Sequence, residues 1–241
     1  MAALRRWLIL SVLAALALQA FFVGRIALMA RLDPQSTAFQ RSEAWRLASA
    51  GRLRWSQAWR DYDRISDHLK RAVIASEDDA FVNHEGVDWT AIEKAWDRNA
   101  KAEALAAERA ARDQPARPVK IRGGSTITQQ LAKNLLLSGE RTLLRKGQEL
   151  ALTYALEVLL DKRRILEIYL NNVEWGEGVF GAEAAARHYF NKSAAQLDPW
   201  ESARLAVMLP RPRYFERLPR SAYLSHRAGV IVQRMRSAEL P

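Results

Sequence analysis

The stretch EDDAFVNHEG, residues 77–86, follows a segment whose apolar residues have helical spacing. Ser66 is the expected N-cap of this helix, and residues 65, 69, 72 and 73 form its apolar side. Glu77 and Asp78 then fall at the helix C-terminus, where unpaired carboxylates are unfavourable beside the negative end of the helix dipole. Other groups of the protein must therefore hold them. The stretch is either a reaction centre or an ordinary polar helix end.

A second informative stretch is GGSTITQQLAKNLLL, residues 123–137. Its two glycines favour a flexible approach, Ser125 or Thr126 can act as N-cap, and a helix is expected to follow. The order of lysine and hydroxyl residues excludes a phosphate-binding P-loop, and Lys133 taken alone is better explained as a solvated surface charge. Helical spacing places a polar row, formed by Gln130, Lys133, Asn134 and Leu137, beside an apolar row formed by Ile127, Leu131 and Leu135.

Arg141, Arg145 and Lys146 form a basic cluster just before Glu149. The plain interpretation is a set of ion pairs on a helix surface. The alternative is an anion-binding site with an acid inside it. The cluster alone favours the plain interpretation, and both stay open at this point.

The overall charge indicates an anionic partner. Lys and Arg outnumber Asp and Glu by 37 to 27, a formal net charge of +10. This excess suits nucleic acid, phospholipid head groups or a phosphorylated substrate, and charge alone does not choose among them. The chain has no cysteine, which excludes disulfides and thiolate chemistry.

The N-terminus is predicted to span a membrane. Residues 7–24 carry no charge, and this length approaches the ~20 residues that a helix needs to cross the hydrocarbon core. A cleaved signal peptide is the alternative, but the apolar run exceeds the usual length of about 7–15 residues and the small-residue cleavage site is poor. The predicted transmembrane helix covers residues 7–30. Arg5 and Arg6 favour an orientation in which residues 1–6 are cytoplasmic and everything beyond the helix lies outside the cytoplasm.

The remaining chain is predicted to hold a linker and one domain. Residues 31–54 are polar and basic and include a proline and a glycine, which is typical of a linker. Residues 89–111 are expected to be helical. Residues 114–122, with two prolines and several basic residues, are expected to form a connection beside a cleft.

Five runs in this order closely resemble the biosynthetic peptidoglycan glycosyltransferases, and the match extends from about residue 55 to residue 235. The runs are EDDAFVNHEG, GGSTITQQLAKN, RKGQE, KRRILEIYLNNVEWGEGVFGAEAAARHYFNK and WESARLAVMLPRPRYF. The chain has no SxxK sequence, which the transpeptidase domain of bifunctional members needs, so it resembles the monofunctional transglycosylase. The resemblance implies a mainly α, lysozyme-like glycosyltransferase domain over 55–236, with a smaller membrane-facing lobe and one N-terminal transmembrane helix.

The implied reaction is polymerisation of lipid II. The acceptor's sugar 4-hydroxyl displaces undecaprenyl pyrophosphate from the lipid-linked growing glycan, with inversion, to give a β-1,4 link. Glu77 matches the family's catalytic base, and Glu149 matches its second essential glutamate. The residues that match substrate-binding positions, or lie beside them, are Asp78, Thr126, Gln130, Lys133, Asn134, Arg141, Arg145 and Lys146.

The resemblance also implies the surroundings of this reaction. The expected location is the bacterial inner membrane, single-pass, with the catalytic domain in the periplasm. The expected partners are lipid II, the membrane and other cell-wall synthesis proteins, without nucleic acid. No fixed cofactor is expected, and Mg²⁺ or Mn²⁺ would act only as an aid at the substrate pyrophosphate. A second membrane contact is expected at residues 114–122 and at Leu135–Leu137.

Two rival functions remain. A hydrolase of the lysozyme or lytic transglycosylase type would also be helical with an essential glutamate, but it needs a protonated acid, and the basic cluster around Glu149 opposes a raised pKa. A catalytically idle membrane scaffold would not need Glu77, Glu149 and the cations together. The sequence therefore favours the polymerase.

Overall fold

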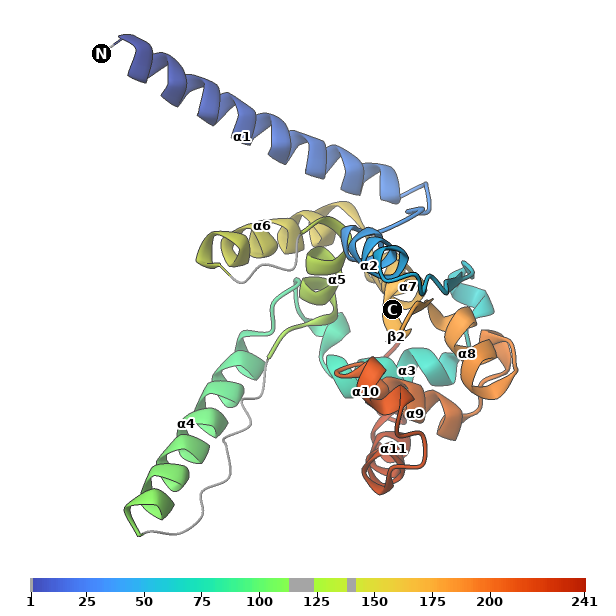
Figure 1. Ribbon diagram of the computed structural model, residues 1–241. Helices are drawn as coiled ribbons and strands as arrows, with labels where there is room; N and C mark the ends of the chain where they lie inside the picture. Colours follow the sequence, from blue (N-terminus) through green and yellow to red (C-terminus); the bar gives the residue numbers. More distant parts are fainter. Residues whose placement is uncertain (1, 113–123, 138–141) are drawn as a thin grey trace.

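The protein is mainly helical, as predicted. The computed structural model describes residues 2–112, 124–137 and 142–241 (Figure 1). Its α-helices are α1 (Ala2–Met29), α2 (Ala38–Ser49), α3 (Asp67–Glu77), α4 (Trp89–Ala111), α5 (Ile127–Leu136), α6 (Leu143–Leu159), α7 (Lys162–Asn172), α8 (Ala182–Phe190), α9 (Pro199–Met208), α10 (Pro212–Glu216) and α11 (Ala222–Arg234). The 3-10 helices are η1 (Tyr62–Arg64), η2 (Phe81–Asn83) and η3 (Ala194–Gln196).

Helix α1 extends away from the rest of the molecule and meets it only at its C-terminal end (Figure 1). Ile26 and Met29 are its buried residues. By length and composition, α1 can cross a membrane. Its orientation, and the choice of anchor over cleaved signal, stay predictions.

The core forms around α9, which packs against both α3 and α11. Helix α3 begins where the sequence predicts, because the Ser66 side chain accepts a hydrogen bond from the His68 N–H. Its side chains Leu69, Ala72 and Val73 are buried in this core. This packing fixes the C-terminal end of α3, where Glu77 lies.

A small sheet joins distant parts of the chain. Its strands are β1 (Ser56–Gln57), β2 (Glu174–Gly176) and β3 (Val179–Phe180), in the order β1-β3-β2. Strand β1 is parallel to β3, with Ser56 opposite Val179, and β2 is antiparallel to β3. Gly178, at φ +76°, lies so near this contact that an added Cβ would stand 2.0 Å from the Arg54 carbonyl oxygen. A side chain there would force the strands apart.

The segment predicted as a linker contains helix α2. Thr37 caps it with a capping box, and its Leu47 is buried. Gln40 Nε2 donates to the carbonyl of Asn172 at 3.5 Å, and Arg46 bonds Glu177 at 2.8 Å. These partners lie more than a hundred residues away, so the local sequence does not reveal that α2 belongs to the folded body.

The expected second membrane contact is wrong for Leu135–Leu137. All three leucines are buried, because the apolar row of α5 packs into the core and α5 contacts α6. The other expected element, residues 114–122, lies outside the described residues.

Glu183 at the start of α8 is a buried ionic centre. Its carboxylate accepts hydrogen bonds from Arg60 and Arg187, each at 3.0 Å, from Ser193 Oγ at 3.2 Å and from the Ala194 N–H at 2.8 Å. Burial opposes ionisation, but these donors outweigh it and lower the pKa of Glu183 to about 2. The charged carboxylate therefore joins α8 to the segments around it.

We expect Glu183→Gln to lower the free energy of unfolding by about 2 kcal/mol at neutral pH. Because the folded pKa lies below the unfolded value, the contribution is complete above the unfolded pKa of about 4.3 and is lost as pH falls toward 2. Urea unfolding at a series of pH values should show the two proteins converging in acid. Glu108→Gln, which breaks only an exposed pair with Arg112, should change little. A constant difference down to pH 2 would contradict this account.

Candidate functional site

Glu77 is held at the C-terminus of α3 by a side chain from another helix. Gln130 Nε2 of α5 donates to Glu77 Oε2 at 3.0 Å, and Ser76 Oγ lies 3.5 Å from the other oxygen. Burial raises the pKa of Glu77, and these two hydrogen bonds partly oppose the rise. The carboxylate is thus a base of increased strength. Gln130 and Ser76 are the groups that hold it at the helix end, as the sequence required.

The orientation of Gln130 is fixed from α7. Tyr169 donates its hydroxyl hydrogen to Gln130 Oε1 at 3.0 Å. The tyrosine is buried, and burial, together with the nearby acids Glu77 and Asp78, raises the pKa of its hydroxyl well above the usual value, so it remains a donor. The amide oxygen of Gln130 is thereby committed to Tyr169, and its NH₂ group faces Glu77.

Asp78 joins the two motif segments. Its Oδ2 accepts from the Ile127 N–H at the start of α5 at 2.9 Å, and its Oδ1 lies 2.8 Å from His84 Nε2. The Gly86 N–H donates to His84 Nδ1 at 3.1 Å, so Nε2 carries the ring hydrogen and donates to Asp78. Both carboxylate oxygens of Asp78 are therefore engaged within the protein, and His84 orients the loop.

Thr126 is the N-cap of α5, one of the two candidates from the sequence. Its Oγ1 accepts from the Gln129 N–H and donates to the Gly86 carbonyl at 2.6 Å. Gly86 adopts φ +84°, and an added Cβ would lie 2.7 Å from Thr153 Cγ2. The run 77–86 therefore leads from the end of α3 toward α4 and is fixed against the start of α5.

Glu149 is a buried carboxylate with two basic partners on its own helix. Arg145 Nη1 lies 2.8 Å from Glu149 Oε2, and Lys146 Nζ bonds the other oxygen. The pairs have the helical spacing of the plain interpretation, but Glu149 is 3% exposed, which an ordinary surface pair would not be. Arg145 Nε is buried and has no hydrogen-bond partner among the residues that the structure describes. The cluster thus keeps an unused donor.

Two cavities lie around Glu77 and Gln130. The first, of about 480 Å³, is lined by Glu77 and Thr126, with the basic side chains Lys94, Arg98 and Arg234 on its walls. The second has a volume of about 650 Å³. Its lining includes Gln130, Lys133, Asn134 and Arg145, together with Arg41 and Ser42 of α2. Gln130 lines the second cavity and bonds the glutamate of the first, so this pair lies between the two cavities.

The structure brings most of the predicted site residues to these two cavities. Asp78 also lines the first. Glu149 and Lys146 line neither cavity and are bound to each other. Arg141 lies outside the described residues. The residues that sequence reasoning missed are Arg41, Lys94, Arg98, Tyr169 and Arg234.

The sequence contains only weak indications that the missed basic residues belong to the site. Lys94 and Arg98 are one helical turn apart on α4, which places them on the same face, but this spacing is common on solvated helices. Tyr169 has the apolar spacing of a scaffold helix, and only its hydroxyl indicates a polar partner. Arg41 belongs to the segment predicted as a linker.

Comparison with known proteins identifies the family. The family model described as Transglycosylase matches residues 46–236. A biosynthetic peptidoglycan transglycosylase of Paraburkholderia phytofirmans is 51% identical, covering 98% of this chain and 94% of that protein. Another from Burkholderia thailandensis is 52% identical, covering 94% of this chain and 83% of that protein. The chain therefore belongs to the transglycosylase family, in its biosynthetic peptidoglycan branch.

Proposed function

We propose that this glycosyltransferase polymerises lipid II into β-1,4 glycan chains for the bacterial cell wall, with inversion and release of undecaprenyl pyrophosphate. One observation carries the proposal: a base of raised pKa, Glu77, lines one cation-lined cavity and is bonded by Gln130, which lines a second. Polymerisation joins two sugars that are each carried on a lipid-linked pyrophosphate, so it requires an anion-binding region on each side of the reacting atoms.

Glu77 is the proposed general base. It takes the proton from the acceptor's 4-hydroxyl while that oxygen forms a bond to the donor's anomeric carbon. The bond from this carbon to the pyrophosphate oxygen breaks, and its electron pair leaves with the pyrophosphate. Gln130 holds Glu77 in place through the hydrogen bond at Oε2, which leaves lone pairs on the carboxylate for the incoming hydroxyl.

The second cavity is the proposed donor side. A pyrophosphate leaving group needs cations more than it needs an acid, and Lys133 and Arg145 line this cavity. The Arg145 side chain is 16% exposed, and its guanidinium group suits a phosphate oxygen. Glu149 holds Arg145 in place and offsets the charge of the neighbouring cations. The predicted roles of Arg141 and Lys146 remain part of this proposal.

The first cavity is the proposed acceptor side. The acceptor also carries a pyrophosphate, and Lys94, Arg98 and Arg234 supply cations there. Arg234 is already paired with Asp79 at 3.1 Å, which leaves the two α4 residues as the main candidates. Asp78 and Thr126 line this cavity but have their side chains engaged in the loop, so their proposed contribution is to shape it.

A divalent ion is proposed only as a companion of the substrate. Both oxygens of Asp78 are occupied by His84 and Ile127. Among the residues that the structure describes, no group of three or more potential acidic or histidine ligands is placed to hold a metal. Mg²⁺ or Mn²⁺ would then arrive with the pyrophosphate and be held mainly by its oxygens.

The inner membrane is the proposed location, with the N-terminus cytoplasmic and the catalytic domain periplasmic.

Helix α6, which contacts α1, presents an apolar exposed face that replaces Leu135–Leu137 as the proposed second membrane contact. Leu144 and Val158, near its two ends, are 89% and 82% exposed. Between them the exposed positions are Lys146, Gly147, Ala151 and Tyr154. This face suits a lipid surface beside the emerging anchor.

The hydrolase remains the alternative to test, because a glutamate of raised pKa can serve as acid or base. We expect Glu77→Gln to lower the rate of lipid II polymerisation at least ~10²-fold, since a general base is removed. The assay is labelled lipid II in detergent, with gel separation of glycan products. Glu85→Gln, an exposed residue of the same loop, is the matched control and should retain its rate. Consumption of polymeric glycan without use of lipid II would establish the hydrolase instead.

We expect Tyr169→Phe to shift the acid limb of the pH profile of kcat/KM upward by about half a unit. Without the hydroxyl, Gln130 is free to turn its amide, its hydrogen bond to Glu77 weakens, and the pKa of Glu77 rises further. Activity is then lost at a higher pH than in the unaltered enzyme. Tyr223→Phe on α11, which is exposed, should leave the profile in place. An unmoved acid limb would show that Tyr169 only fills space.

The α6 face can be tested with a fluorophore, because the chain has no cysteine of its own. We expect a polarity-sensitive dye on Leu144→Cys, in full-length protein reconstituted into anionic liposomes, to shift to shorter wavelength and to be quenched by a lipid-borne quencher. The same dye on Ser225→Cys, an exposed position on α11, should behave as in water. If both sites report water, the proposed contact is wrong.

A further inference from the structure

The C-terminal end of α1 is joined to the rest of the protein both by buried apolar side chains and by hydrogen bonds. Ile26 and Met29 are buried and belong to the main core cluster. Arg25 Nη2 of α1 donates to the Ser36 carbonyl at 3.1 Å, and Arg41 Nη1 of α2 donates to the same oxygen at 3.3 Å. The last turns of α1 are therefore part of the folded domain.

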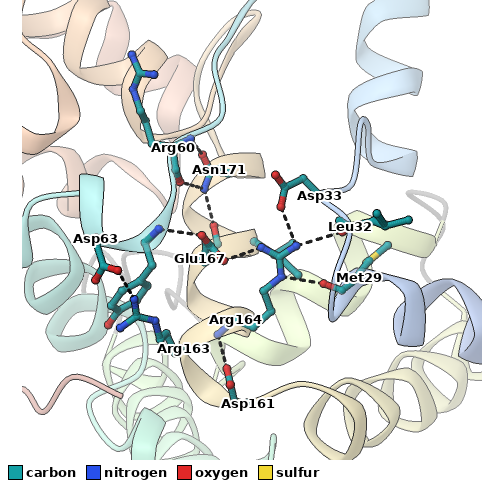
Figure 2. Close-up of polar contacts among 12 residues, drawn as sticks. Met29, Leu32, Asp33, Arg60, Asp63, Asp161, Arg163, Arg164, Glu167 and Asn171 are labelled. Carbon is teal, nitrogen blue, oxygen red and sulfur yellow. Dashed lines mark hydrogen bonds and ion pairs between the residues drawn. The ribbon is translucent and has the colours of Figure 1, made fainter.

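A single guanidinium closes this junction. Arg164 of α7 donates from Nε to the Met29 carbonyl at 2.8 Å and from Nη2 to the Leu32 carbonyl at 3.1 Å (Figure 2). The same Nη2 bonds Asp33 Oδ1 at 2.8 Å. The last carbonyls of a helix lack partners within it, and a cation is favourable at that end. Arg164 thus satisfies the C-terminal end of α1 from outside the helix.

The guanidinium is itself held in place. Arg164 Nη1 bonds Glu167 Oε2 at 2.6 Å (Figure 2). The other oxygen of Glu167 accepts from the Tyr62 N–H at 2.8 Å. The guanidinium carbon lies 5.4 Å from the centre of the Trp59 ring. The Arg164 side chain is 15% exposed. The planar guanidinium group is therefore held in place independently of its contacts with α1.

We propose that Arg164 is a positioning residue that locks the membrane anchor and the catalytic domain into one rigid body, so that α1 sets the height and tilt of the cleft over the bilayer. This rests on the proposed membrane location. Residues 7–24 of a helix cover about 27 Å, close to the ~30 Å of the hydrocarbon core. Met29 then lies only about 7 Å beyond that core, so the Arg164 contacts fall at the level of the head groups.

A fixed orientation matters because both substrates keep their lipid tails in the bilayer. A domain on a flexible tether samples many tilts, and only some bring both cavities to the membrane surface together. In a bilayer, a rigid junction prevents the tilts that keep the two cavities from reaching the membrane surface together. In detergent, where the lipid-linked substrate and the enzyme share small mobile micelles, it gives little advantage.

Rigidity is measured directly by the distance between two spin labels. Leu16 of α1 and His226 of α11 are exposed and can be changed to Cys in the cysteine-free chain. In full-length protein in liposomes, we expect a narrow distance distribution that Arg164→Ala broadens at least twofold. Arg164→Lys keeps the charge but lacks the planar fork, so it should also broaden the distribution. Asp33→Ala removes one contact without disturbing the core and should broaden it to a smaller extent.

Arg163→Ala is the matched control. This neighbouring arginine pairs with the exposed Asp63 at 2.5 Å and makes no contact with α1 among the interactions that the described residues show. Its distance distribution should equal that of the unaltered protein. Thermal unfolding in detergent checks that each variant is folded. A narrow distribution in folded Arg164→Ala or Asp33→Ala would overturn the proposal.

Activity gives the second readout. We expect Arg164→Ala to lower lipid II polymerisation about tenfold in proteoliposomes and less than twofold in detergent. An equal loss in both media would mean that Arg164 acts on the cleft itself, and the positioning role would be wrong. If the unaltered protein polymerised no lipid II in either medium, the proposed function would fail, while the distance measurement would still decide the junction.

Discussion

The hydrogen bond from Gln130 to Glu77 is the contact that the site depends on. A partly buried carboxylate at a helix C-terminus is unfavourable because it loses water and faces the negative end of the dipole. The amide of Gln130 offsets part of this cost, but only if α5 stands at the right height beside α3. Asp78 sets that height by bonding the first N–H of α5, and Tyr169 of α7 sets the direction of the amide. Three helices are thereby aligned around one carboxylate.

The two glutamates of the site differ in surroundings and therefore in chemistry. Glu77 is held by neutral donors, so it keeps its basicity and has room to receive a proton. Glu149 is bonded by two cations on its own helix and has both oxygens engaged. A carboxylate in the surroundings of Glu77 suits proton transfer, whereas one in the surroundings of Glu149 suits the positioning of the neighbouring cations.

The sequence predicted the parts of the fold whose causes are local. The N-cap of α3, the cap of α5 and the extent of α4 follow from residues within one or two turns. Helix α2 was missed because its stability comes from partners such as Asn172 and Glu177, far along the chain. At the candidate site, Glu77, Gln130 and Lys133 were predicted from their motifs, and each lines one of the two cavities.

The rest of the site could not be derived in that way. The cations of α4 look like any solvated helix surface, and the hydroxyl of Tyr169 meets Gln130 only after α5 and α7 have packed. The leucines after Asn134 were misjudged because an apolar run at a helix end suits a core and a lipid surface equally.

Helix α2 has a practical consequence for inhibitor discovery. It begins nine residues after α1 ends, and Arg41 and Ser42 form part of the wall of the second cavity. A soluble enzyme shortened to residue 55, where the predicted domain begins, would present compounds with a cavity open on one side. Ligands selected against it would be shaped for a space that the full-length enzyme does not offer. Screening with a chain that retains Thr37, the cap of α2, would preserve the wall that a compound must fit.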